Sequence, residues 1–93
     1  MFVRVVRFTD VTAERVQSLV ADIDATGPPP GVPIKKLQLV FDEGQGTAVV
    51  LQFFEDEEDL RIGAEAFAAM DPSETPGSRA SVDTGELKVE RTL

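Results

Sequence analysis

Apolar and polar residues change their periodicity several times along the chain, and each change marks a predicted element. Residues 2–8, FVRVVRF, are rich in β-branched and aromatic side chains, which predicts a first strand. A helical stripe of apolar side chains follows, at Val16, Leu19, Val20 and Ile23. This spacing predicts an amphipathic helix that begins after an N-cap at Thr12 and ends at Gly27.

The middle of the chain predicts a stiff loop, a hairpin and a second helix. In GPPPGVP, residues 27–33, prolines fix φ and remove hydrogen-bond donors, so neither a helix nor a central strand fits. Residues 34–54 contain two β-branched and aromatic runs around an acidic, glycine-containing turn at 42–46, which is typical of a hairpin. The acidic run 55–59 lacks the alternating ligand spacing of a calcium loop, and it favours a helix start with Asp56 as N-cap.

The last quarter of the chain predicts a connector and a final strand. SETPGSRASVD, residues 73–83, gathers serines, acids and Arg79 around Pro76 and Gly77. A nucleophilic serine needs a base, and without histidine this segment is predicted to be a turn-containing connector rather than a catalytic loop. Residues 81–93 alternate, with Leu87, Val89 and Leu93 on one side, which predicts a half-exposed strand.

The predicted order is therefore β-α-β-β-α-β, the split arrangement of ferredoxin-like α+β folds. Right-handed crossovers place both helices on one face of a four-stranded antiparallel sheet. At 93 residues the chain has the length of one domain, which we expect to span residues 1–93.

With this length and order, the start MFVRVVRF and the passage DEGQGTAVVLQFFEDEEDL, the chain resembles the dimeric α+β barrel superfamily. It is most similar in outline to small proteins of the antibiotic-biosynthesis monooxygenase type. The resemblance implies a dimeric α+β barrel, in which two subunits close their sheets face to face and ligands lie between each sheet and its surroundings. Members include cofactor-free oxygenases of aromatic polyketides, haem-degrading proteins and many proteins without a known activity.

The composition bears on which of these activities the chain can share. Those oxygenases rely on asparagine, tryptophan, tyrosine or histidine, and the haem-degrading relatives need a histidine on iron. This sequence contains none of these residues and no cysteine, so no catalytic residue can be carried over from the resemblance. Without imidazole or thiolate ligands we also expect no metal and no cofactor.

Charge and hydropathy narrow the expected partners. With 17 acidic and 9 basic residues the formal net charge is −8, which disfavours nucleic acid because phosphate binding needs a basic face. No apolar run reaches bilayer length, and the N-terminus lacks the features of a secretory signal. We therefore expect no membrane partner and a cytoplasmic location.

The hairpin pattern predicts a homodimer. If a turn of this length keeps residues of equal parity on one face, the helices cover Leu37, Leu39, Phe41, Val49, Leu51 and Phe53. The other face then holds Ile34, Lys36, Gln38, Val40, Ala48, Val50, Gln52 and Phe54, and it is too apolar to be left in water. We predict that a second subunit covers it through Ile34, Val40, Val50 and Phe54.

Two glutamines on that face suggest a ligand site. If the first strand turns Arg4 toward Gln52, as its neighbour in this topology, a small polar group stands in an apolar cavity, typical of a small-molecule site. The predicted ligand-binding residues are Arg4, Gln38, Gln52, Phe54 and Arg79. Arg79 enters because its loop can cover the mouth of the cavity and bring it to an anionic ligand.

Two alternatives remain open. The glutamines could instead bond each other or their dimer mates, with Arg4 paired to Glu86 or Glu90. The facing of the first strand is also undecided, because Val3 and Val5 compete with Val6 and Phe8 for the core.

For function, the sequence favours a non-catalytic dimeric barrel that binds a small apolar or aromatic ligand, or that acts as an assembly partner. The alternative is a cofactor-independent monooxygenase-like enzyme acting on an aromatic polyketide or a quinol-type substrate. In that enzyme a desolvated cavity and Arg4 would stabilise an anion.

Overall fold

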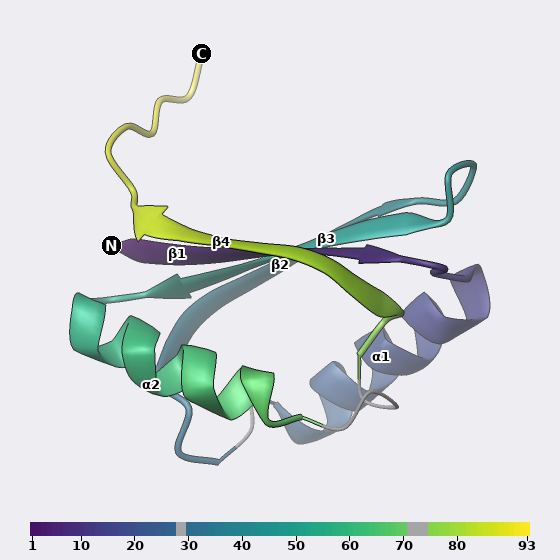
Figure 1. Cartoon of the computed structure of the whole chain (residues 1–93), viewed down its shortest axis with the longest axis horizontal. Coiled ribbons are helices and arrows are strands. Elements are labelled where there is room, and N and C mark those ends of the chain that lie inside the picture. The colour runs from purple at the N-terminus through teal and green to yellow at the C-terminus, as the bar shows by residue number, and fades with distance from the viewer. Residues whose placement is uncertain (28–29, 71–74) are drawn as a thin grey trace.

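The computed structural model describes residues 1–27, 30–70 and 75–93, and it contains the predicted elements in the predicted order (Figure 1). They are β1 (Phe2–Thr9), α1 (Ala13–Thr26), β2 (Ile34–Asp42), β3 (Thr47–Phe54), α2 (Glu57–Ala68) and β4 (Ser78–Glu86). The strands form one antiparallel sheet in the order β2-β3-β1-β4, with both helices beneath the same face (Figure 1). The predicted α+β, ferredoxin-like class is confirmed.

Both helices begin at the predicted caps. The Thr12 side chain accepts a hydrogen bond from the Arg15 backbone N–H at 3.2 Å, and Asp56 accepts one from Asp59 at 2.8 Å. Three acidic residues occupy the first turn of α2, where the unpaired N–H groups and the helix dipole favour negative charge. At the end of α1, Gly27 has a φ of 70° and donates to the Ile23 carbonyl at 2.8 Å. Residues 28–29 of the predicted proline loop lie outside the described residues.

The predicted facing of the hairpin is wrong. Four residues separate Asp42 from its cross-strand partner Thr47, so opposite residues on β2 and β3 differ in parity. Leu39 therefore faces the same side as Val50. Because side chains alternate along a strand, an even-numbered loop exchanges the parity of the second strand, and every residue of β3 lies on the face opposite to the predicted one.

This register moves most of the predicted dimer interface into the core. The face of the sheet that the helices cover carries these inward-facing residues: Arg4, Val6, Phe8, Leu37, Leu39, Phe41, Ala48, Val50, Gln52 and Phe54. Val50 and Phe54 are buried there by the chain's own helices, so they are not available to a second subunit. Ile34 pairs with Phe54 and lines the same interior. Of the four predicted interface residues only Val40 lies on the open face, where it is 59% exposed.

The open face is nevertheless apolar, with different members. Opposite one another on it are Val3 and Phe53, Val5 and Leu51, and Val40 and Val49. Polar side chains stand among them at Arg7, Lys36 and Gln38, and the Lys36 ammonium lies 5.1 Å from the centroid of the Phe53 ring. Neither helix covers this face (Figure 1). The open face therefore remains largely apolar after the change of register.

The last strand begins earlier and ends earlier than predicted. β4 covers residues 78–86, so residues 78–83 of the predicted connector are strand, and only 75–77 form a bend. Residues 71–74 lie outside the described part of the chain. The predicted strand beyond Glu86 is wrong, because β4 pairs with β1 only as far as the Phe2–Glu86 pair. After a last hydrogen bond from the Leu87 N–H to the Met1 carbonyl, the chain leaves the sheet (Figure 1).

The fold predicts that Gly63 is required in α2. A Cβ at this buried position would overlap the ring of Phe54, which is fully buried between α2 and the sheet. Gly63→Ala gains about 1 kcal/mol in helix propensity but over-packs the core at about 1 to 3 kcal/mol. We expect a net loss of up to about 2 kcal/mol in the free energy of unfolding, measured by urea denaturation.

Gly85→Ala is the matched control, since a Cβ at Gly85 meets no atom within 4 Å. It should change stability by less than about 0.5 kcal/mol. A Gly63→Ala protein as stable as this control would contradict the close packing of α2 on Phe54.

Candidate functional site

A cavity of about 670 Å³ lies between the sheet and the two helices. This volume is within the range of small-molecule sites. Most of its walls are apolar: the sheet contributes Val6, Phe8, Leu39 and Val50, α1 contributes Leu19 and Ile23, and the end of α2 and the residues after it contribute Phe67, Met70 and Pro76. A few charged and polar residues also line the cavity: Arg4, Gln52, Asp22, Lys35, Lys36 and Arg79.

Arg4 and Gln52 form the polar centre of the cavity. They are directly opposite each other on β1 and β3, and Arg4 Nη1 donates a hydrogen bond to Gln52 Oε1 at 2.9 Å. Each residue is only 4% exposed. The predicted approach of Arg4 to Gln52 is confirmed, and β1 is now known to turn Arg4, Val6 and Phe8 inward. The alternative pairing of Arg4 with Glu86 or Glu90 is wrong.

Phe67 connects this pair to a second arginine. The guanidinium carbon of Arg4 lies 5.7 Å from the centroid of the Phe67 ring, within cation–π range. Arg79 Nη2 donates to the Phe67 carbonyl oxygen at 3.4 Å. Two guanidinium groups from the two neighbouring strands β1 and β4 therefore meet one residue at the end of α2.

The electrostatics of Arg4 follow from this position. Burial lowers the pKa of Arg4 below its ordinary value, and the positive charge of Arg79 lowers it further. A guanidinium remains protonated at any physiological pH, so both cations persist beside the cavity.

The structure brings together three of the five predicted ligand-binding residues. Arg4, Gln52 and Arg79 line the cavity. Gln38 lies on the open face, opposite Leu51, and cannot reach Gln52 through the sheet. Phe54 is fully buried beneath Gly63 and belongs to the packing of α2 rather than to the cavity wall. Both misplacements follow from the reversed parity of the hairpin.

Sequence reasoning missed Leu19, Ile23 and Phe67 as cavity residues. All three belong to the apolar stripes that predicted the helices. Their role was available from the sequence once the cavity was placed on the side of the sheet that the helices cover.

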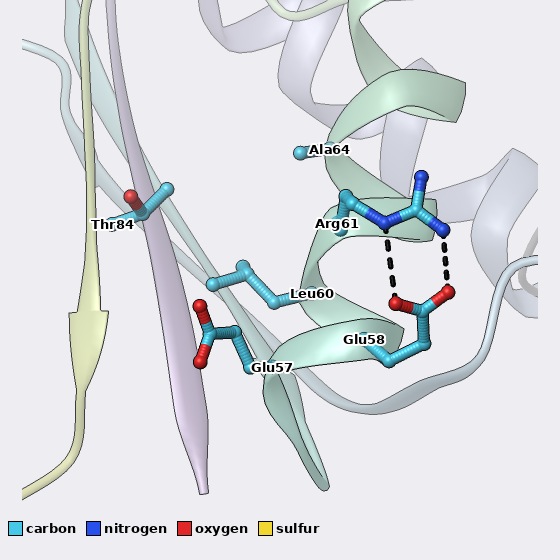
Figure 2. Close-up of a pocket in the computed structure, with 6 residues that line it drawn as sticks. All are labelled: Glu57, Glu58, Leu60, Arg61, Ala64 and Thr84. Atoms are coloured by element: carbon cyan, nitrogen blue, oxygen red, sulfur yellow. Dashed lines mark hydrogen bonds and ion pairs between the residues drawn. The ribbon is translucent and has the colours of Figure 1, made fainter.

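A second hollow, of about 500 Å³, lies between α2 and β4 (Figure 2). Figure 2 shows Glu57 and Leu60 extending toward Thr84, while Glu58 and Arg61 pair with each other on the outer side of the helix. Arg61 also contacts Glu65 at 3.1 Å. The hydrogen bond and charge of Arg61 lower the pKa of Glu58. These polar groups are exposed and satisfied, as on a solvated helix surface, so this hollow is the weaker candidate.

Two kinds of feature are absent from the described residues. No group of three acidic, histidine or cysteine side chains in residues 1–27, 30–70 and 75–93 is placed to hold a metal ion. In the same part of the chain, neither helix is long and apolar enough to cross a membrane.

Comparison with known proteins identifies the fold. No family model matches the chain, and no curated protein matches it in sequence. Among solved structures, an antibiotic biosynthesis monooxygenase superposes with a TM-score of 0.58 at 16% identity, covering 98% of this chain and 100% of the other. A mutant of MhuD, described with two manganese protoporphyrin IX molecules bound per active site, gives 0.56 at 17% identity, covering 100% of this chain and 98% of the other.

A third similar structure is described as a putative antibiotic biosynthesis monooxygenase from Deinococcus radiodurans, with a TM-score of 0.52, 12% identity, and coverage of 100% of this chain and 96% of the other. Each match spans essentially the whole of both chains. The predicted resemblance to antibiotic biosynthesis monooxygenases is therefore confirmed at the level of the fold.

The Arg4–Gln52 contact predicts a measurable coupling. Gln52→Leu leaves a buried guanidinium without its acceptor, and we expect the free energy of unfolding to fall by about 1.5 to 3 kcal/mol. The double variant Arg4→Met, Gln52→Leu replaces both partners by apolar groups and should lose less than the sum of the single variants. Urea denaturation of the four proteins measures this coupling. Additive losses would show that the contact contributes nothing.

Proposed function

We propose that this protein is a homodimer that binds a small apolar or aromatic molecule, without chemical turnover, in the cavity between its sheet and its helices. The observation that carries the proposal is the cavity itself, whose apolar walls surround one buried, hydrogen-bonded polar pair, Arg4 and Gln52. Such walls supply affinity by excluding water, and a few fixed polar groups orient the ligand.

The solved structures with the same fold support a ligand with an aromatic ring system. The MhuD variant holds two manganese protoporphyrin IX molecules per active site, so this fold can accommodate large aromatic ring systems in that protein. The residues of this chain do not fit an iron porphyrin. The chain has no histidine, cysteine or tyrosine to ligate iron, and the described residues contain no cluster of metal-ligating side chains.

The dimer is supported by the open face of the sheet. Val5 and Leu51 lie opposite each other at its centre, on the two inner strands, with Val3 and Val49 beside them, and all four are half-buried in the single chain. Full burial of an aliphatic side chain contributes about 1.5 to 3 kcal/mol. A second copy would supply the remaining part of this for the half-buried residues, and more of it for Val40, which is 59% exposed. Closing two sheets together would give the dimeric α+β barrel that the sequence resembles.

A second candidate function is a cofactor-independent monooxygenase acting on an aromatic polyketide or quinol-type substrate. Two of the similar structures are described as antibiotic biosynthesis monooxygenases, and a buried guanidinium such as Arg4 can stabilise the anion of a readily oxidised substrate. The absence of histidine, tyrosine, tryptophan, asparagine and cysteine makes this the less favoured of the two.

Ligand binding is tested by thermal shift with a panel of neutral and anionic aromatic molecules, because a ligand of the folded state raises the apparent stability. Ile23→Trp places a large side chain at the cavity wall and should abolish the shift. Val20→Trp, on the exposed side of α1, should leave it intact. No shift with any compound would overturn the proposal. Oxygen uptake with hydroquinones and anthrones would support the enzymatic candidate instead.

The dimer is tested with Val40→Lys, which places a charge on the open face. We expect dimer dissociation to become at least about tenfold easier, equivalent to about 1.4 kcal/mol, in sedimentation at micromolar concentration. Val20→Lys, a matched change on the exposed side of α1, should sediment as the unmodified protein does. A well-folded monomer for the unmodified chain would contradict the dimer while leaving the cavity in place.

A further inference from the structure

Basic residues are concentrated around the cavity of an otherwise acidic protein. Four of the nine basic residues of the chain, Arg4, Lys35, Lys36 and Arg79, line the cavity, although the Lys36 ammonium itself lies on the open face and the charge at the cavity comes from the other three. Of the 17 acidic residues, only Asp22 lines it among those that the structure describes. The charge around the cavity is thus opposite in sign to that of the whole chain.

Among the described residues, the two arginines of this group have no acidic partner. Within 1–27, 30–70 and 75–93, ion pairs join Lys35 to Glu55, Lys88 to Glu86, and Arg61 to two glutamates of α2, and none includes Arg4 or Arg79. The Lys36 ammonium lies against the Phe53 ring on the open face. Arg4 bonds a neutral amide and Arg79 a neutral carbonyl. A charge buried without a counter-ion is costly, so a buried guanidinium of this kind indicates a place for an anion.

The geometry brings both guanidinium groups to one part of the wall. Arg4 lies over the Phe67 ring, with 5.7 Å between its guanidinium carbon and the ring centroid, and Arg79 bonds the Phe67 carbonyl. The charge of Arg79 also lowers the pKa of Arg4, as expected for two cations that lie close together without a screening anion. One bound oxyanion would relieve this repulsion and could accept hydrogen bonds from both.

We propose that the ligand is an anionic aromatic or apolar molecule whose single oxyanion, a carboxylate or a phenolate, lies between Arg4 and Arg79 beside Phe67. The proposal rests on the ligand-binding function given above and specifies its substrate class. Arginine is suited to this role because its planar fork matches a carboxylate. The apolar body of the ligand then occupies the wall formed by Leu39, Val50 and the inner side of α1.

The test compares naphthoate with naphthamide, which share a ring system and nearly the same shape but differ in charge. A charge-assisted hydrogen bond is worth enough to give about tenfold in affinity, so calorimetry should show naphthoate binding at least about tenfold more tightly. Arg79→Met should remove most of this preference and leave naphthamide binding unchanged. Arg79 is exposed and outside the core, so this variant should fold normally.

Arg91→Met is the matched control, because it changes the net charge equally at an exposed position in the C-terminal segment. It should keep the full preference for naphthoate. Equal affinity of the two ligands, or a preference that Arg79→Met leaves intact, overturns the anion site while the proposed binding function stands. Failure of both ligands and of the whole aromatic panel overturns the binding function and the anion site together.

Discussion

The register of the β2–β3 hairpin is the constraint on which the rest of the structure depends. The length of the loop between Asp42 and Thr47, four residues, determines which side chains of β3 face the helices. It places Val50 and Phe54 in the core and Gln52 opposite the inward-facing Arg4. A loop one residue longer or shorter, with the same two strands, would turn Gln52 to the open face and leave the guanidinium of Arg4 without its acceptor.

The interior that results is incompletely filled. Helices that packed tightly along the whole sheet would leave no room for a ligand, and here close packing is confined to particular places. Gly63 lets α2 contact the ring of Phe54, while Val6, Val11 and Ala48 form a core cluster against α1. Between these two regions lies the cavity, with a polar pair where a core would normally hold apolar side chains. The two packed regions stabilise the fold, and the space between them is where we propose that the ligand binds.

The sequence predicted the elements, their order, the helix caps and the approach of Arg4 to Gln52, because these depend on local chemistry and on topology. Hydrophobic periodicity is strong in the strands and helices, and Thr12 and Asp56 are typical caps. The prediction of which hairpin side chains face the helices was wrong for a different reason. Both faces of β2 and β3 are apolar, so polarity did not distinguish them, and the result depended on counting the loop residues correctly.

The prediction of a strand at the end of the chain was wrong, because alternation of apolar and polar residues does not by itself make a strand. Leu87, Val89 and Leu93 have the right spacing, but β1 offers no partner beyond Phe2. In contrast, residues 78–86 have little apolar character and still form β4, because the backbone of β1 was available to pair with them. The availability of the β1 backbone, rather than the apolar pattern, determined which of these residues formed the strand.

The polar edge formed by β4 has a consequence for how copies of this protein associate. Its residues are all exposed and include serines, Asp83, Thr84 and Glu86, which offer little to an incoming strand. Edges of this kind discourage the edge-to-edge pairing of sheets from different molecules, which leads to fibres. In the proposed dimer, the contact would use the same patch of the open face on both molecules, so neither copy would keep a free patch once they meet. An assembly of this kind closes at two subunits.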